Sequence, residues 1–293
     1  MNKVDQLLLG TLRLVHRWQF GFKLRLHTAE QGRLAYLKST PHKERPTLVF
    51  LHGLGASKDQ WGTAVMSMAR DYECVLVDLP GHGESLYEPF SDFGPQSLMS
   101  ALEGFLETVV KGPFVLIGSS LGGCVAGLYA AKYPQRVSHL ILLSPAGLGM
   151  KSLGPILQAR LQRGQTGFGY RTVREMQRFW GLVYKRPPKV RSRWAQAMAA
   201  SGKSRFNAVQ RITNDFRREG LDVLLERLPS IVSSTLVIWG RHDQVFLHGT
   251  LDVMLEDLPN ARGLIIEDSG HAAYLERGRE VTAAITEFIS TTH

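Results

Sequence analysis

The chain has 293 residues, a length that suits one α/β domain with an insertion, and its 44% apolar composition is ample for a core. Its two cysteines, Cys74 and Cys124, both lie inside apolar stretches, which excludes a scaffold held by disulfides. No convincing signal peptide opens the sequence, so we expect a cytoplasmic protein.

The net charge of +9 is concentrated in the middle of the chain. Residues 151–232 hold 17 Lys and Arg against 5 Asp and Glu, so the remainder is slightly acidic. A basic surface attracts anionic lipid headgroups, acidic substrates or nucleic acids. No nucleic-acid-binding motif accompanies it, so we expect no nucleic-acid partner. Peripheral contact with an anionic membrane and a solvated arginine-rich face without a partner are equally good explanations.

Residues 1–21 predict an amphipathic N-terminal helix. Apolar side chains, among them Leu8 and Trp18, recur on one face, whereas Arg13 and Arg17 fall on the other. Such a helix can lie on a membrane surface. Its apolar run is short and interrupted by charge, however, so packing on the body of the protein is the favoured interpretation.

A hairpin and then alternating strands and helices are predicted next. Residues 22–27 and 33–38 alternate in polarity around a glycine turn, which predicts an antiparallel hairpin at a sheet edge. The alternation that follows predicts a mostly parallel, doubly wound sheet, whose ligands bind beyond the carboxyl ends of its strands. The predicted strands cover residues 46–51, 73–77, 114–117, 138–143, 235–239 and 262–267, and the predicted helices cover 57–70, 96–110, a run ending at 132, another ending near 258 and the C-terminal end.

Residues 148–232 do not continue this alternation of strands and helices. They contain no strong strand pattern, and helical patches at 171–183 and 191–200 are separated by Pro187-Pro188. We therefore predict an inserted helical cap over the strand ends, with the α/β core formed by residues 22–147 and 233–293.

A G-x-S-x-G motif lies at residues 118–122, between a buried strand and a helix. A serine in such a sharp turn takes strained backbone angles, and Gly118 and Gly122 must be small because strand and helix crowd them. The motif alone is a weak signal, since a glycine turn without chemistry has the same letters. The surrounding uncharged run of eighteen residues is long enough for a membrane span, but its paired glycines and serines favour a buried parallel strand that feeds a helix.

Several motifs support this interpretation, and together the chain resembles the α/β-hydrolase family in its serine esterase and lipase branch. The HGLGASKDQW stretch is most similar to members of the monoacylglycerol-lipase type. The motifs that carry the resemblance are HGLGASKDQW at 52–61, DLPGHGES at 78–85, GSSLGG at 118–123, GRHDQVF at 240–246 and DSGHAAYLE at 268–276. The resemblance implies an α/β-hydrolase fold with a helical cap and a serine nucleophile.

The candidate catalytic residues are Ser120, Asp243 and His271. Ser120 needs an adjacent base to become a nucleophile. Ten histidines compete for that role, but only His271 lies in the loop after the last predicted strand. Asp243 follows the preceding strand and would orient the imidazole, although a loop aspartate can instead cap a helix. The order Ser, Asp, His along the chain is the one expected for this fold.

Two backbone N–H groups are expected to stabilise the oxyanion of a tetrahedral intermediate. The N–H of Leu121, directly after the nucleophile, is one. By resemblance, the N–H of Leu54 in the loop after strand 46–51 is the other. Asp78 and His82 follow a neighbouring strand, and we assign them to the architecture of their loop.

Three functions are compatible with these residues. The first is a serine hydrolase that cleaves carboxylic esters of lipid-like or small acyl substrates. The second keeps the same triad but acts as a C–C bond hydrolase of the meta-cleavage type or as a thioesterase. The third is a binding protein of this fold with little turnover. No metal-ligand spacing or dinucleotide fingerprint occurs, so we expect no metal and no cofactor.

Overall fold

The computed structural model describes residues 10–11, 17, 21–29, 32–41, 45–87, 92–165 and 167–291. The predicted helix over residues 1–21 falls mostly outside these ranges. Of that segment, Gly10, Thr11, Arg17 and Gly21 are described.

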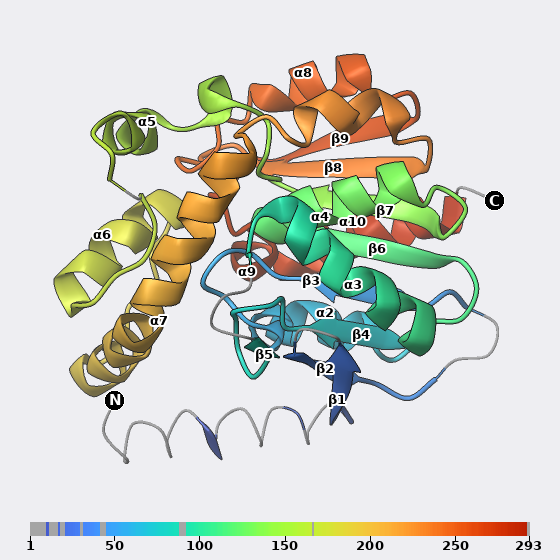
Figure 1. Ribbon diagram of the computed structural model, residues 1–293, viewed down its shortest axis with the longest axis horizontal. Helices are drawn as coiled ribbons and strands as arrows, with labels where there is room; N and C mark the ends of the chain where they lie inside the picture. Colours follow the sequence, from blue (N-terminus) through green and yellow to red (C-terminus); the bar gives the residue numbers. More distant parts are fainter. Residues whose placement is uncertain are drawn as a thin grey trace.

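A single sheet organises the protein (Figure 1). Within the described residues its strand order is β1-β2-β4-β3-β6-β7-β8-β9, and the short β5 pairs with β2. The β1–β2 hairpin and the contacts of β2 with β4 and β5 are antiparallel, whereas the other pairings are parallel. The predicted edge hairpin and the mostly parallel sheet are therefore confirmed. The strands are β1 Lys23–Ala29, β2 Gly32–Lys38, β3 Leu48–Leu51, β4 Cys74–Val77, β5 Leu86–Tyr87, β6 Phe114–Ser119, β7 Val137–Leu143, β8 Ser234–Gly240 and β9 Ala261–Ile266.

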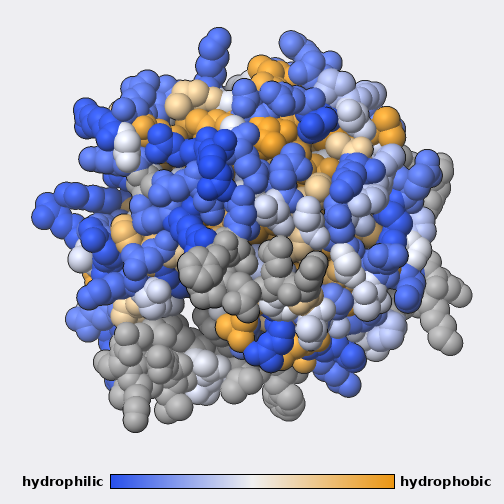
Figure 2. All heavy atoms as spheres, in the orientation of Figure 1, coloured by the Kyte–Doolittle hydropathy of each residue, from blue (hydrophilic) through white to orange (hydrophobic). Residues whose placement is uncertain are grey.

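Helices cover both faces of the sheet, which explains why its central strands are apolar along their whole length. Alternate residues of β3 point to opposite faces: Leu48 and Phe50 belong to one buried cluster, Val49 and Leu51 to another. The first cluster includes side chains of α2 (Gly62–Met68), α9 (Ala273–Glu276) and α10 (Gly278–Thr291). The second includes those of α3 (Pro95–Val109), α4 (Leu121–Lys132) and α8 (Thr250–Asp257). Hydrophilic side chains cover most of the face shown in Figure 2.

In the described part of the segment between β7 and β8, three α-helices gather on one side of the sheet (Figure 1): α5 (Pro155–Gln162), α6 (Val173–Val183) and α7 (Ser192–Glu219). Two 3-10 helices, η2 (Met150–Ser152) and η3 (Leu225–Ser230), flank them. Helix α7 runs far past the helical patch predicted at 191–200, and α5 and β5 were not predicted. Serine and glycine have low helix propensity, so the Ser201-Gly202 pair gives no sequence signal for a continuous helix. Gly202 is needed there, because a Cβ on it would lie 2.1 Å from the Tyr170 ring.

The turn between β6 and α4 places Ser120 at the carboxyl edge of the sheet. Ser120 has φ 55° and ψ −116°, a strained conformation for a non-glycine residue. A Cβ on Gly118 would lie 2.3 Å from the Gly122 carbonyl oxygen, and one on Gly122 would lie 2.2 Å from the Leu51 carbonyl oxygen. The expectation that strand and helix crowd these two glycines is confirmed.

This crowding makes a testable prediction about stability. Gly122→Ala should lower the free energy of unfolding by about 1–3 kcal/mol, because the added methyl group meets fixed backbone atoms. Gly104→Ala is the matched control: Gly104 lies within α3 with no atom near its missing Cβ. That change should raise the free energy of unfolding by up to about 1 kcal/mol. Urea denaturation of both variants measures the difference, and equal effects would contradict the crowding argument.

Candidate active site

The structure brings two of the predicted residues into direct contact. His271 Nδ1 lies 2.8 Å from Asp243 Oδ2. A carboxylate only accepts hydrogen bonds, so Nδ1 carries the proton, and in the neutral ring Nε2 is left as an acceptor. The ring of Phe246 packs edge-on against the imidazole at 5.3 Å between centroids.

The second carboxylate oxygen of Asp243 also accepts hydrogen bonds. Oδ1 accepts hydrogen bonds from the backbone N–H groups of Val245, at 2.8 Å, and Phe246, at 3.0 Å. Asp243 caps no helix, since the N-cap of α8 is Gly249. Its carboxylate is therefore held in one orientation, and that orientation fixes the tautomer of His271.

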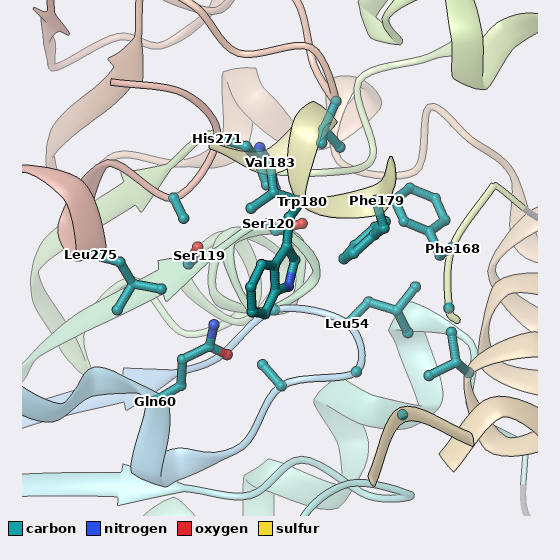
Figure 3. Close-up of a pocket in the computed structure, with 18 of the residues that line it drawn as sticks. Leu54, Gln60, Ser119, Ser120, Phe168, Phe179, Trp180, Val183, His271 and Leu275 are labelled. Carbon is teal, nitrogen blue, oxygen red and sulfur yellow. The ribbon is translucent and has the colours of Figure 1, made fainter. Parts of the chain in front are cut away.

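Ser120 and His271 line the same cavity, which has a volume of about 420 Å³ (Figure 3). Ser120 itself is anchored by its backbone, because its N–H donates to the Leu143 carbonyl and its carbonyl accepts from the N–H groups of Cys124 and Ala146. A smaller pocket of about 60 Å³ also contains Ser120 and Leu54, and Leu121 lines it. All five predicted site residues thus lie at or beside one cavity.

Aromatic side chains form part of the cavity wall, and most of them come from the segment between β7 and β8. Phe179, Trp180 and Val183 project from α6, and Phe168 lies just before that helix (Figure 3). From the other side of the cavity, Leu275 belongs to α9. Sequence reasoning identified none of these residues, because aromatic side chains on an amphipathic helix are equally typical of a core.

The loop after β3 lies directly against the candidate nucleophile. A Cβ on Gly53 would lie 3.2 Å from Ser120 Cβ and 3.7 Å from Ser120 Oγ, and the next residue, Leu54, lines the same cavity as Ser120. His52 Nδ1–H donates to the Gly53 carbonyl at 2.8 Å, and its Nε2 accepts from the Leu79 N–H at 3.1 Å. The buried imidazole therefore links this loop to the one after β4. Sequence reasoning missed the role of His52, although it opens the HGLG motif.

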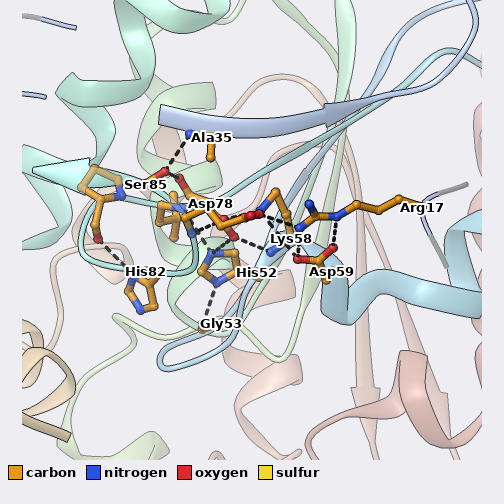
Figure 4. Close-up of polar contacts among 12 residues, drawn as sticks. Arg17, Ala35, His52, Gly53, Lys58, Asp59, Asp78, His82 and Ser85 are labelled. Carbon is orange, nitrogen blue, oxygen red and sulfur yellow. Dashed lines mark hydrogen bonds and ion pairs between the residues drawn. The ribbon is translucent and has the colours of Figure 1, made fainter. Parts of the chain in front are cut away.

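A layer of buried charge lies beneath that loop (Figure 4). Lys58 is fully buried, and its ammonium contacts the carboxylates of Asp78 and Glu84. Asp78 also accepts hydrogen bonds from the backbone N–H groups of Lys58, at 2.7 Å, and Glu84, at 2.8 Å. Asp78 therefore organises its loop, as we inferred from the sequence.

Arg17 extends this layer by a two-point ion pair. Its guanidinium donates to both oxygens of Asp59 at 2.7 and 2.8 Å and also contacts Glu84. Burial by itself lowers the pKa of Arg17, but the hydrogen bonds to Asp59 and Glu84 outweigh it, so the net direction is upward. Since Asp59 also lines the cavity, the ion pair places Arg17 close to the candidate site.

Burial also sets the protonation of two histidines in this region. It lowers the pKa of His52 to about 4 and that of His82 to about 3. The two rings pack edge to face at 4.9 Å between centroids. His82 Nδ1–H donates to the Pro80 carbonyl, and Nε2 has no hydrogen-bond partner among the described residues. Both rings are therefore neutral above pH 5.

The described residues contain no cluster of three or more metal-ligating side chains. In that same part of the chain, no helix has the length and apolar character needed to cross a bilayer.

Comparisons with known proteins agree with this fold. A family model described as alpha/beta hydrolase fold matches residues 46–278. Monoacylglycerol lipase ABHD6 of Mus musculus is 28% identical over 290 residues, which cover 94% of this chain and 85% of the relative. Lipase 1 of Psychrobacter immobilis is 25% identical over 236 residues, covering 78% and 72%. The crystal structure of a membrane phospholipase A, a bacterial virulence factor, superposes with a TM-score of 0.91 at 27% identity, covering 99% of this chain and 92% of that one.

The buried histidines predict how stability depends on pH. The folded protein holds His52 and His82 neutral, whereas the unfolded chain protonates both near the ordinary value of 6.5. Their contribution to stability is therefore present above pH 6.5 and is lost as the pH falls toward 4. Each histidine adds a slope of up to about 1.4 kcal/mol per pH unit. The slope of the unfolding free energy between pH 6.5 and 4 should be smaller in His82→Phe, and an unchanged slope would contradict the assignment.

Proposed function

The chain belongs to the α/β-hydrolase family and is a carboxylic ester hydrolase of its esterase and lipase type, and we propose that it cleaves lipid-like esters through an acyl-enzyme on Ser120. The observation that carries this proposal is the Asp243–His271 hydrogen bond of 2.8 Å at the cavity that also exposes Ser120. In this scheme His271 is the general base and Asp243 orients it.

The reaction proceeds in two balanced steps. Ser120 Oγ attacks the ester carbonyl while its proton passes to His271 Nε2, and the N–H groups of Leu54 and Leu121 stabilise the resulting oxyanion. Collapse of this intermediate breaks the bond to the alcohol, which leaves with the proton held by His271. A water molecule then attacks the acyl-enzyme with His271 again as base, which releases the carboxylic acid and restores Ser120.

The lining of the cavity supports an apolar acyl group as the substrate. Phe168, Phe179, Trp180 and Val183 present apolar and aromatic surface to the cavity that Ser120 also lines, and such walls favour hydrocarbon over water. Because α6 supplies three of these four side chains, we propose that residues 148–232 act as the cap that selects the substrate. The names of the relatives, a monoacylglycerol lipase and bacterial lipases, agree with this substrate class.

We further propose that the protein contacts anionic membranes peripherally through the α6–α7 connection. Lys189, Arg191 and Arg193 are exposed there, and Val190 between them is 38% exposed. Cationic side chains with an apolar neighbour suit an interface of anionic headgroups. This connection starts at Tyr184, which lines the cavity, so docking through it would hold the cavity near its lipid substrate.

The triad predicts a large loss of activity on substitution. Ser120→Ala, and separately His271→Ala, should lower kcat for p-nitrophenyl butyrate by several orders of magnitude, with residual catalysis of about 10³–10⁴-fold over water. Labelling with a fluorophosphonate probe should be lost in Ser120→Ala. Circular dichroism verifies that both variants fold. A folded Ser120→Ala protein with wild-type turnover would disprove the proposed mechanism. Acyl-CoA and a vinylogous diketone acid, assayed in parallel, test the thioesterase and C–C hydrolase alternatives.

The membrane proposal predicts a dependence on lipid charge. Changing Lys189, Arg191 and Arg193 together to Gln should weaken binding to phosphatidylglycerol vesicles by up to about 100-fold, given roughly 1 kcal/mol for each basic residue. Vesicle co-sedimentation measures this, with phosphatidylcholine vesicles as the neutral reference.

The matched control removes the same charge elsewhere, by changing the exposed Lys111, Arg262 and Arg279 to Gln. Equal losses in both triple variants, or no preference of the wild type for anionic vesicles, would reject docking through this connection.

A further inference from the structure

The carboxylate of Glu276 joins two segments that are distant in the sequence. Its Oε2 accepts hydrogen bonds from the Gly270 N–H at 2.7 Å and from the Lys185 N–H at 3.1 Å. Its Oε1 accepts from the Arg186 N–H at 2.9 Å. Gly270 directly precedes His271, whereas Lys185 and Arg186 follow the end of α6 by two and three residues. One side chain therefore binds the backbone of the His271 loop and the backbone that leaves α6.

A second connection lies on the other side of His271. The Ala272 N–H donates to the Val183 carbonyl at 3.3 Å. The two segments also pass in close contact, because a Cβ on Gly270 would lie 2.6 Å from the Val183 carbonyl oxygen and 2.8 Å from the Lys185 nitrogen. Both chain neighbours of His271 are therefore held against the last residue of α6 and the two residues after it.

The same end of α6 faces the cavity. Trp180 and Val183 line it together with Ser120, as Figure 3 shows, and the Val183 carbonyl also accepts the hydrogen bond from Ala272. A displacement of α6 that opened or reshaped the cavity would consequently pull on the backbone to either side of the imidazole. The Asp243 carboxylate restrains the ring from its Nδ1 side, but Asp243 does not restrain the loop backbone that carries it.

We propose that Glu276 is a positioning residue that couples the packing of α6 to the placement of His271, so that the base is aligned with Ser120 when α6 is seated. This inference rests on the proposed function, because it assigns to His271 the role of general base. Glu276 touches neither substrate nor reacting atoms; it acts through the loop.

Ion pairs at the rim do not replace this carboxylate. Lys185 Nζ and the Arg186 guanidinium lie 2.7 and 3.2 Å from the same oxygen of Asp268, and these side chains are 29%, 76% and 29% exposed, respectively. Exposed pairs of this kind contribute little because solvent screens them. They also join flexible side chains to each other, whereas Glu276 binds backbone N–H groups whose positions follow the loop directly.

The first test separates turnover from binding. In Glu276→Ala, kcat for p-nitrophenyl butyrate should fall by about 10²-fold with KM changed less than about twofold, since small misplacement of a catalytic group has effects of this size. Glu276→Gln retains one acceptor oxygen and should lose less. The downfield ¹H NMR signal of the His271 Nδ1 proton should shift or broaden in both variants, because the imidazole is no longer held in one place. Glu280→Gln, which removes an exposed carboxylate paired with Arg277 one turn further on, is the matched control.

The second test is a double-mutant cycle that measures coupling to α6. Met176 is fully buried between α6 and α7 and does not line the cavity, so Met176→Ala loosens the seat of α6 without touching substrate. We expect Met176→Ala to lower kcat in the wild-type background and to have much less effect when Glu276 is Ala.

Strictly additive effects, wild-type kcat in a folded Glu276→Ala variant, or an equal loss in Glu280→Gln would overturn the proposal. Its failure is distinguishable from failure of the proposed function, which Ser120→Ala tests alone. If Ser120→Ala is inactive and Glu276→Ala is unaffected, only the coupling is wrong.

Discussion

The strained turn at Ser120 is the constraint on which the rest of the site depends. A positive φ at a serine persists only where the surroundings enforce it, and here the backbone at the ends of β7 and β3 does so. The Ser120 N–H and carbonyl are bonded to residues at and beyond the end of β7, and Gly122 packs on the carbonyls of Leu51 and His52. Any shift of β3 or β7 relative to β6 would relax the turn, so the parallel sheet is what keeps the hydroxyl exposed at its edge.

The loop opposite Ser120 is fixed by a different kind of interaction. Almost all of the described polar groups that are buried under this loop have hydrogen-bond partners. Both ring nitrogens of His52 form hydrogen bonds with backbone groups. The Lys58–Asp78 pair is fully desolvated, and such pairs tend to add little net stability compared with an apolar core. Their directional bonds to the backbone instead give the loop one conformation, which matters where two N–H groups must aim at one oxygen atom.

The proposed catalytic residues and the wall of the cavity come from different parts of this chain. Ser120, Asp243 and His271 follow β6, β8 and β9, so the sheet places all three. Most of the aromatic wall of the cavity instead belongs to the segment inserted between β7 and β8. This division lets the wall vary without disturbing the triad. The contacts of Val183 and Glu276 with the His271 loop connect this wall to the proposed base.

Much of the fold and of the candidate site could be predicted from the sequence alone. The strand and helix pattern, the edge hairpin and the candidate residues Ser120, Asp243 and His271 were all predictable. Parallel strands bring their carboxyl ends to one edge, so position along the chain already implied proximity in space. Only the tertiary structure decided which side chains of α6 and α7 face the cavity, how far α7 extends past Gly202, and that His52 and Glu276 hold the loops around the site. Those features depend on contacts between segments distant in the sequence, such as Gly202 with Tyr170 and Glu276 with Lys185. Local periodicity carries no information about such pairs, because a residue's neighbours across a fold are set by packing.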